Sequence, residues 1–117
     1  YSIMISDSLR AKHCPSGGEY ELGGHPIEIR DNGLAYLKGT DTIAGSTLHI
    51  NRGLRLLVEE ALVPFDAALN ACTINPARCL RVDDHKGRLA AGYDADLVVL
   101  EDNYDVCQTY CKGVAML

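Results

Sequence analysis

Residues 87–100 read Gly87-Arg88-Leu89-Ala90-Ala91-Gly92-Tyr93-Asp94-Ala95-Asp96-Leu97-Val98-Val99-Leu100. The two glycines suit turns, and the four apolar residues that end the segment predict a strand buried on both faces. Asp96 is expected to cap or pair at the edge of this strand. Asp94 and Asp96 would share one face of a turn with no histidine nearby, which favours a structural role for both carboxylates over a metal site. By itself the segment indicates fold and no chemistry.

The chain before this segment predicts three helices, at residues 50–61, 64–72 and 76–80. Ser46 or Thr47 is the expected N-cap of the first helix. Pro64 is expected at the first position of the second helix, and Asn75-Pro76 at the start of the third. After the quoted segment, two further strands are expected at residues 104–111 and 114–117.

Short strands and turns precede the helices. Strands are expected at residues 19–22, 25–30 and 34–37, with turns at Gly23-Gly24 and Asp31-Asn32-Gly33. This pattern indicates a small antiparallel meander, inserted after a first strand at residues 1–5.

The first strand is followed by a carboxylate, Asp7. A strand end is stiff, so it would hold the acid in place at the mouth of a pocket. Most aspartates after a strand only terminate it, and the pattern alone leaves both interpretations open.

A second candidate site lies at Ile43, Ala44 and Gly45. Small residues allow a backbone to approach a ligand closely. If the next residues open a helix, free N–H groups and the positive end of the dipole would face that ligand, which suits a phosphate or a sugar hydroxyl. The alternative is that Gly45 simply fits a turn before a capped helix.

Composition limits the class of protein. The 117 residues carry a net charge of −5 with 47% hydrophobic residues, which indicates a globular chain and argues against nucleic acid or anionic membranes as partners. No apolar stretch is long enough to span a membrane, and the first residues do not form a signal peptide. Five cysteines without a C-x-x-C pair favour reduced thiols and a cytoplasmic setting, and the four histidines match no metal-ligand spacing.

Residues 87–100 resemble the C-terminal β-sandwich signature of the amidohydrolase superfamily. Within it, four further motifs resemble the enzymes that deacetylate an amino-sugar phosphate: Ile5-Ser6-Asp7-Ser8-Leu9-Arg10-Ala11-Lys12, Gly18-Glu19-Tyr20-Glu21-Leu22-Gly23-Gly24, Thr42-Ile43-Ala44-Gly45-Ser46-Thr47 and Asn75-Pro76-Ala77-Arg78. The sandwich signature is specific only to the superfamily, and the meander is what selects the deacetylases.

The resemblance implies an α/β fold: the last strand and helices of a metal-dependent-hydrolase (β/α)8 barrel, followed by the C-terminal part of a β-sandwich. Residues 1–80, with the meander insert at 19–37, would end the barrel domain, and residues 81–117 would supply the sandwich strands. A barrel needs eight strands and about 250 residues, of which this chain could supply one strand. We therefore expect the C-terminal portion of a longer enzyme.

The resemblance also implies the chemistry. Asp7 would take a proton from a metal-bound water and give it to the departing amine, and Ile43, Ala44 and Gly45 would contact the substrate. The divalent metal, of the zinc or iron class, would be held by residues upstream of Tyr1, so these residues alone are expected to hold no metal and to be inactive. Many relatives have Thr-Asp-Ala where this chain has Ser6-Asp7-Ser8. The intact enzyme is expected to be a homodimer.

Two other functions stay open on the sequence. A dihydroorotase-like or deaminase-like hydrolase would share the superfamily but not the substrate, although the meander and the Ala-Gly-Ser segment argue against it. A β-rich module that binds a protein partner would not be an enzyme.

Overall fold

The computed structural model describes residues 1–14 and 18–116. The chain forms two compact units: residues 6–49 make one, and residues 1–5 with the residues from 50 onwards make the other. The expected domain division between residues 80 and 81 concerns the complete enzyme and stays a prediction.

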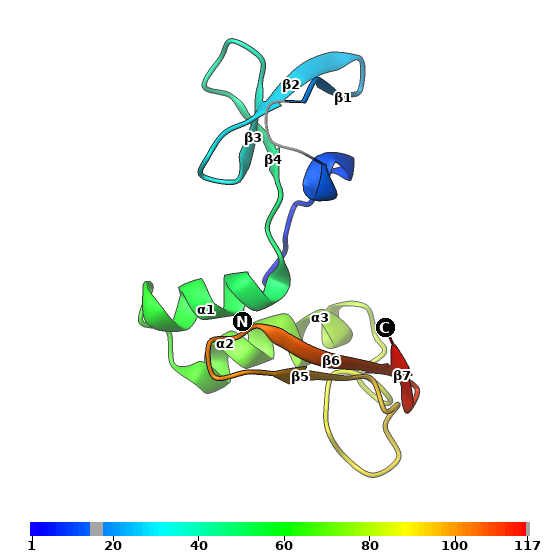
Figure 1. Cartoon of the computed structure of the whole chain (residues 1–117). Coiled ribbons are helices and arrows are strands. Elements are labelled where there is room, and N and C mark those ends of the chain that lie inside the picture. The colour runs from blue at the N-terminus through cyan, green and yellow to red at the C-terminus, as the bar shows by residue number, and fades with distance from the viewer. Residues whose placement is uncertain (15–17, 117) are drawn as a thin grey trace. The chain divides into compact units, whose positions relative to one another are not determined.

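The unit of residues 6–49 is a four-stranded antiparallel sheet in the order β1-β2-β3-β4 (Figure 1). Its elements are the 3-10 helix η1 (Arg10–His13) and the strands β1 (Tyr20–Leu22), β2 (His25–Ile29), β3 (Leu34–Leu37) and β4 (Ile43–Ser46). Leu22 pairs with His25, so Gly23-Gly24 forms the expected two-residue turn. The predicted meander is confirmed, and β4 adds a strand that the sequence pattern did not indicate.

One face of this sheet is buried. Ile27 pairs with Leu37, and Ala35 pairs with Ile29, so the four side chains share a face. Ile27 and Ala35 are almost fully buried, as is Ala11 of η1. The strand predicted at residues 25–30 is therefore confirmed as β2, and the alternation of its side chains between the two faces determines the register of the meander.

The second unit contains three helices: α1 (Ile50–Glu59), α2 (Phe65–Cys72) and α3 (Ile74–Cys79). α1 packs beside α2, and α2 beside α3 (Figure 1). Their buried contacts come mainly from small or branched apolar side chains, Leu54, Ala68, Ala71, Ile74 and Ala77.

The helix starts differ from the sequence prediction. α1 begins at Ile50, so neither Ser46 nor Thr47 is its N-cap, and Ser46 instead ends β4. Pro64 precedes the first residue of α2. α3 begins before the Asn75-Pro76 pair. A proline within the first helical turn is tolerated because its missing N–H would have no partner in the helix.

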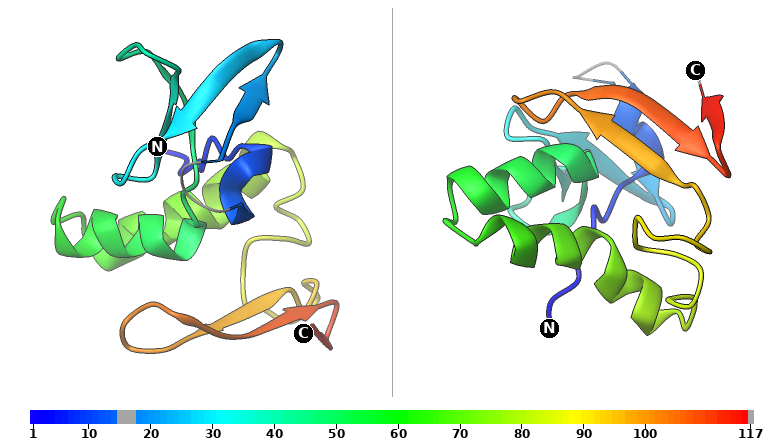
Figure 2. Two further views of the ribbon diagram at one scale, coloured as in Figure 1. Left: turned by 45° about the horizontal axis from the view of Figure 1, so that its top comes forward. Right: turned by 90° about the horizontal axis from the view of Figure 1, so that it is seen from below.

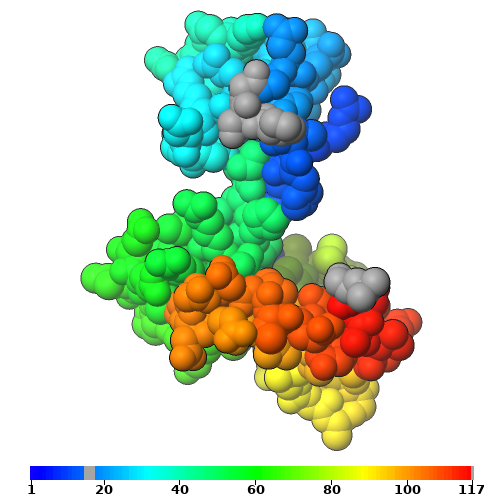
Figure 3. All heavy atoms as spheres, viewed as in Figure 1, coloured from blue at the N-terminus to red at the C-terminus, as the bar shows by residue number. Residues whose placement is uncertain are grey.

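The rest of this unit is a three-stranded antiparallel sheet, β5 (Leu97–Leu100), β6 (Val106–Cys111) and β7 (Val114–Met116), in that order (Figure 2). The expectation that the β5 strand is buried on both faces is wrong here: Val98 is 56% exposed and Val99 45% exposed. Neighbouring residues of a strand point to opposite faces, so both faces of this edge strand are partly exposed. Val106, Val114 and Met116 are exposed as well, on the strands drawn orange to red in Figure 3.

Gly87, the first glycine of the signature, lies against α3. A Cβ at Gly87 would come within 2.9 Å of the Ile74 Cα and 3.0 Å of the Ala77 Cβ, and the φ of Gly87 is +86°. Only glycine permits both the close approach and the left-handed backbone. The signature therefore begins with a packing requirement.

Asp94 and Asp96 are held by one lysine. The Lys86 Nζ donates to the Oδ2 of Asp94 at 2.8 Å and to the Oδ2 of Asp96 at 2.5 Å. The other oxygen of Asp96, Oδ1, accepts the Lys112 main-chain N–H at 2.8 Å. The expected structural role of both carboxylates is confirmed.

Residues 1–5 were expected as a strand and form none in this structure. The Met4 N–H donates to the Ala71 carbonyl at 2.9 Å, and the Asn75 Nδ2 donates to the Ser2 carbonyl at 2.8 Å. A strand requires a second strand beside it, and the partners of this segment are helical residues.

Among the described residues, no helix has the length and apolar character that crossing a membrane requires.

Candidate functional site

Asp7 has an unusual backbone. Its φ is +46°, in the left-handed region that L-residues avoid and that Asp and Asn tolerate best. Its side chain lies at the surface, where it is accessible to a ligand. A non-glycine residue persists in this conformation only when its surroundings hold it there.

Ser46, the last residue of β4, supplies those contacts. Its main-chain N–H donates to the Asp7 carbonyl at 2.8 Å, and its carbonyl accepts the Leu9 N–H at 3.0 Å. This makes a parallel bridge between Ser8 and Ser46. The Ser46 hydroxyl also donates to the Ser6 carbonyl. The segment that carries Asp7 is thus attached to the end of β4 at three points.

Gly45 allows this attachment. A Cβ on Gly45 would lie 2.8 Å from the Leu9 Cγ and 3.0 Å from the Asp7 carbonyl oxygen, and its φ is +145°. The close backbone approach expected at Gly45 exists, but the neighbour described is residues 7–9 of the chain itself. The structure thereby brings Asp7 and the Ile43–Gly45 segment together.

The residues directly after Ile43, Ala44 and Gly45 do not open a helix, contrary to the expectation. These residues belong to β4, which pairs with β3 through Gly45↔Ala35 and Ile43↔Tyr36. α1 begins only at Ile50. The expectation that a helix opens directly after Gly45 is therefore wrong, and Ile43, Ala44 and Gly45 are strand residues. Ile43 remains 57% exposed and Gly45 is buried, so Ile43 offers the apolar side chain of this segment.

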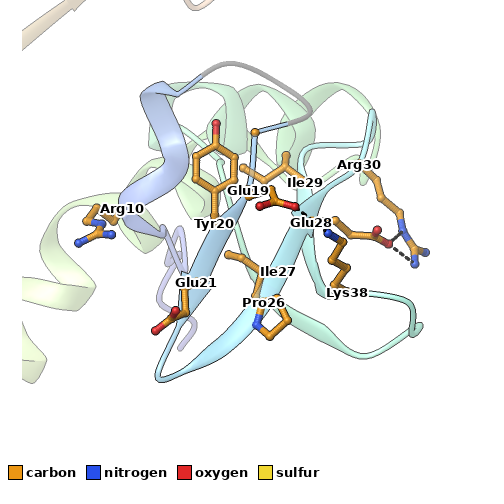
Figure 4. A pocket seen from close by; sticks show the side chains of 11 residues that line it. Arg10, Glu19, Tyr20, Glu21, Pro26, Ile27, Glu28, Ile29, Arg30 and Lys38 are labelled. Carbon is orange, nitrogen blue, oxygen red and sulfur yellow. Dashed lines mark hydrogen bonds and ion pairs between the residues drawn. The ribbon is translucent and has the colours of Figure 1, made fainter.

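A hollow of about 680 Å³ lies over β1 and β2 (Figure 4). Its charged lining residues are three cations and three carboxylates, Arg10, Arg30, Lys38, Glu19, Glu21 and Glu28, and Tyr20 and Ile27 line it beside them. Neither Asp7 nor residues 43–45 line it. The Lys38 Nζ lies 3.2 Å from the Glu19 Oε1, so this lysine is already paired with a carboxylate.

Arg30, at the rim of the hollow, is fully engaged. It donates to Asp41 at 3.0 Å, to Glu28 at 3.0 Å and 3.1 Å, and to the Thr40 carbonyl at 2.6 Å. The hydrogen bond to Asp41, and then that to Glu28, raises the pKa of Arg30. Its guanidinium also lies 3.8 Å from the Tyr36 ring centre. Arg30 therefore ties β2 to the β3–β4 turn and offers little to an anionic ligand.

Two histidines that are far apart in the sequence meet. The rings of His13 and His49 lie edge to face with their centres 5.3 Å apart. Burial lowers the pKa of His49, and Lys12 and His13 lower it further. Their positions in the sequence match no metal-ligand spacing. The two rings come together only through the fold of the meander.

No group of three or more His, Cys, Asp or Glu side chains within residues 1–14 and 18–116 is placed to hold a metal ion. The described residues therefore do not fit a metal centre of their own.

Comparison with known proteins identifies the family. The model of the amidohydrolase family matches residues 24–116. The chain belongs to the amidohydrolase family. This amidohydrolase chain is 37% identical to N-acetylglucosamine-6-phosphate deacetylase of Bacillus subtilis, over 95% of the chain and 27% of that relative. It thus spans about a quarter of the length of the curated relatives it matches.

Solved structures agree. N-acetylglucosamine-6-phosphate deacetylase of Thermotoga maritima matches 97% of this chain with a TM-score of 0.86 and 27% identity, which is 30% of that structure. A mutant deacetylase of Mycobacterium smegmatis, solved in complex with N-acetyl-D-glucosamine-6-phosphate, matches 97% of this chain and 30% of its own, at 37% identity and a TM-score of 0.82. These matches confirm the expected fold, the end of an amidohydrolase (β/α)8 barrel with strands of the β-sandwich. Family membership also suggests a divalent metal in the intact amidohydrolase.

Sequence reasoning missed Ser46 as part of the site. The pattern Ala44-Gly45-Ser46 was interpreted as a loop before a helix. A glycine within a strand often marks a place where another backbone approaches closely, and that signal would have pointed to the contact with Asp7.

Proposed function

We propose that this chain works as part of an N-acetylglucosamine-6-phosphate deacetylase, which hydrolyses the N-acetyl group to give glucosamine 6-phosphate and acetate. The observation that carries the proposal is the identity of 37% to the Bacillus subtilis deacetylase across 95% of the chain. The Mycobacterium smegmatis relative with its bound amino-sugar phosphate supports the substrate class.

In this proposal Asp7 is the catalytic proton-transfer group. Its carboxylate accepts a proton from the attacking water, and the protonated acid then donates to the nitrogen of the departing amine. An exposed carboxylate on a backbone held at φ +46° supports the role, because strained conformations gather at functional sites.

Ile43, Ala44 and Gly45 contact the substrate in the same proposal. The support is their position in β4, whose last residue bridges to Ser8 and so holds the Asp7 segment, and the exposure of Ile43. A rigid strand places such contacts more accurately than a free loop would.

A divalent metal of the zinc or iron class belongs to the proposed enzyme. A metal of this kind polarises a carbonyl group and activates water. In this proposal the metal ligands belong to the rest of the enzyme, and the 117 residues alone should not deacetylate. A homodimer in the cytoplasm stays part of the proposal.

The test replaces Asp7 with Asn in the full-length enzyme. Asn tolerates the left-handed backbone as well as Asp does, so the fold is kept while the proton acceptor is lost. We expect turnover of N-acetylglucosamine 6-phosphate to be nearly abolished, leaving only a small residual rate, and binding of the same compound by calorimetry to be unchanged.

Asp102→Asn is the matched control, because Asp102 is an exposed aspartate that is not among the proposed site residues. Near-normal turnover by the Asp7→Asn enzyme would remove Asp7 from the mechanism. Turnover of cyclic amides but not of the acetylated sugar phosphate would point to another amidohydrolase reaction.

A further inference from the structure

We propose that Ser46 is a positioning residue for Asp7: its hydroxyl holds the Asp7 backbone in the one conformation that aims the carboxylate. The inference rests on the proposed catalytic role of Asp7. It assigns a function to a serine that lies outside the proposed set of substrate contacts.

The argument begins with the two peptide planes beside Asp7. The Ser6 carbonyl lies in the plane before the Asp7 Cα, and the Asp7 carbonyl lies in the plane after it. Each peptide is planar, so the orientation of these two planes determines φ and ψ of Asp7. Ser46 donates to both carbonyls, through its hydroxyl to Ser6 and through its main-chain N–H to Asp7.

The two bonds depend on different parts of Ser46. Any residue except proline would supply the main-chain N–H, but the bond to the Ser6 carbonyl needs a hydroxyl at this position. Loss of the hydroxyl frees the plane that precedes Asp7. Because the left-handed region is unfavourable for an L-residue, φ of Asp7 would then move from +46° toward negative values and carry the carboxylate away.

The hydroxyl has little freedom. Ser46 is 8% exposed, and its Oγ accepts the Leu48 N–H at 3.1 Å. With that bond accepted and water largely excluded, the hydroxyl proton points to the Ser6 carbonyl. The serine is therefore oriented before any substrate arrives.

The next residue provides a comparison within the same segment. The Thr47 hydroxyl donates to the Gly33 carbonyl at 3.0 Å, and so ties the turn of the meander to the chain after β4. Among the described residues, neither the hydroxyl nor the main-chain N–H of Thr47 forms a hydrogen bond to residues 6–9. Thr47→Val removes a comparable hydroxyl bond without touching the Asp7 segment.

The experiment measures kcat and KM for N-acetylglucosamine 6-phosphate in the full-length enzyme. Ser46→Ala and Ser46→Cys should lower kcat on the order of 10- to 100-fold, as expected for a misplaced catalytic group, with KM changed less than about twofold. Ser46→Thr should restore most of kcat because it keeps the hydroxyl, and Thr47→Val should leave kcat unchanged. Circular dichroism melting checks that each variant is folded.

A double-mutant cycle separates positioning from a general effect on the fold. In the Asp7→Asn enzyme, Ser46→Ala should change the residual turnover less than about twofold, because the residue it positions is already disabled. An equal loss in both backgrounds, or equal losses in Ser46→Ala and Thr47→Val, would overturn the positioning role while leaving Asp7 catalytic. Normal turnover in Asp7→Asn would instead reject the proposed role of Asp7, and this inference with it.

Discussion

The main-chain nitrogen of Ser46 lies 2.8 Å from the carbonyl oxygen of Asp7. This hydrogen bond joins the end of β4 to the segment just after residues 1–5, and the Ser46 hydroxyl adds a bond to Ser6, 40 positions earlier in the chain. The candidate catalytic acid and the candidate substrate contacts are therefore parts of one backbone arrangement. Its geometry depends on residues that need not touch a substrate.

Gly45→Ala should disrupt this arrangement. The added methyl group would lie 2.8 Å from the Leu9 Cγ and 3.0 Å from the Asp7 carbonyl oxygen, at a φ of +145° that alanine disfavours. We expect a loss of about 1–3 kcal/mol in the free energy of unfolding from the strained backbone and more from the clash, with turnover also reduced. Urea unfolding and steady-state kinetics of the full-length enzyme measure the two effects.

Gly39→Ala is the matched control for this change. Gly39 has a φ of +76°, but a Cβ there would meet nothing within 4 Å. Gly39→Ala should therefore show the loss of stability that a positive φ causes for alanine, without the clash and without an effect on Asp7. Equal stability and equal turnover in the two variants would show that the contact between β4 and residues 7–9 does not matter.

The sequence predicted the parts of the fold that depend on neighbouring residues. The turn at Gly23-Gly24 and the alternation over residues 25–30 were both found, because turn chemistry and side-chain period are local properties. The contact between Ser46 and Asp7 was not predicted. It depends on the path of the whole meander, and the local pattern at Ser46 also suits a helix N-cap.

The apolar run at residues 97–100 shows a second limit. It correctly predicted a strand, and incorrectly predicted that both faces would be buried, since Val98 and Val99 are exposed. An apolar pattern records which residues are suited to burial. It does not show which layer covers them.

Asn75 should stabilise the unit that contains the three helices through its side chain. Asn75 is 8% exposed, and its side-chain Nδ2 donates to the Ser2 carbonyl at 2.8 Å. The main-chain carbonyl of Asn75 accepts the Tyr1 hydroxyl at 3.3 Å. Asn75→Asp keeps the shape and removes the donor, so we expect a loss of about 1–3 kcal/mol in the free energy of unfolding. Urea unfolding measures it. Asn70→Asp, on the exposed side of α2, is the control, and a similar small change in both would contradict a role for the Ser2 bond.

His49 should titrate below its ordinary pKa of 6.5, because of burial and the neighbouring Lys12 and His13. A base whose pKa is lowered on folding adds stability above its unfolded pKa, and this contribution disappears as the pH falls through the folded value. Lys12→Gln should raise the pKa of His49, as followed by histidine hydrogen–deuterium exchange with mass spectrometry. Lys38→Gln should not, because Lys38 pairs with Glu19 instead. An unchanged His49 pKa in Lys12→Gln would contradict the charge effect.

Lys86→Met should destabilise the unit that contains the three helices and β5–β7 in a pH-dependent way. Hydrogen bonds from Lys86 lower the pKa of Asp94 and Asp96 below the ordinary 3.8, and hydrogen bonds to the two carboxylates raise the pKa of Lys86. Carboxyl groups with a lowered pKa add stability above 3.8 and lose it as the pH falls through their folded values. Wild type should therefore have the higher urea midpoint at pH 7, and the difference should shrink at pH 3 and below.

The two carboxylates should respond unequally to Lys86→Met. Asp94 loses the hydrogen bond that lowers its pKa most, whereas Asp96 still accepts the Lys112 main-chain N–H at 2.8 Å. The pKa of Asp94 should therefore rise further toward 3.8 than that of Asp96. Urea unfolding of Asp94→Asn and Asp96→Asn, each with Lys86 and with Lys86→Met, gives the coupling energy between Lys86 and each carboxylate. Lys38→Met is the control, since the ion-pair partner of Lys38, Glu19, is more exposed than Asp94 and Asp96. A decrease in the urea midpoint as large and as pH-dependent as that of Lys86→Met would refute the special role of the double pairing.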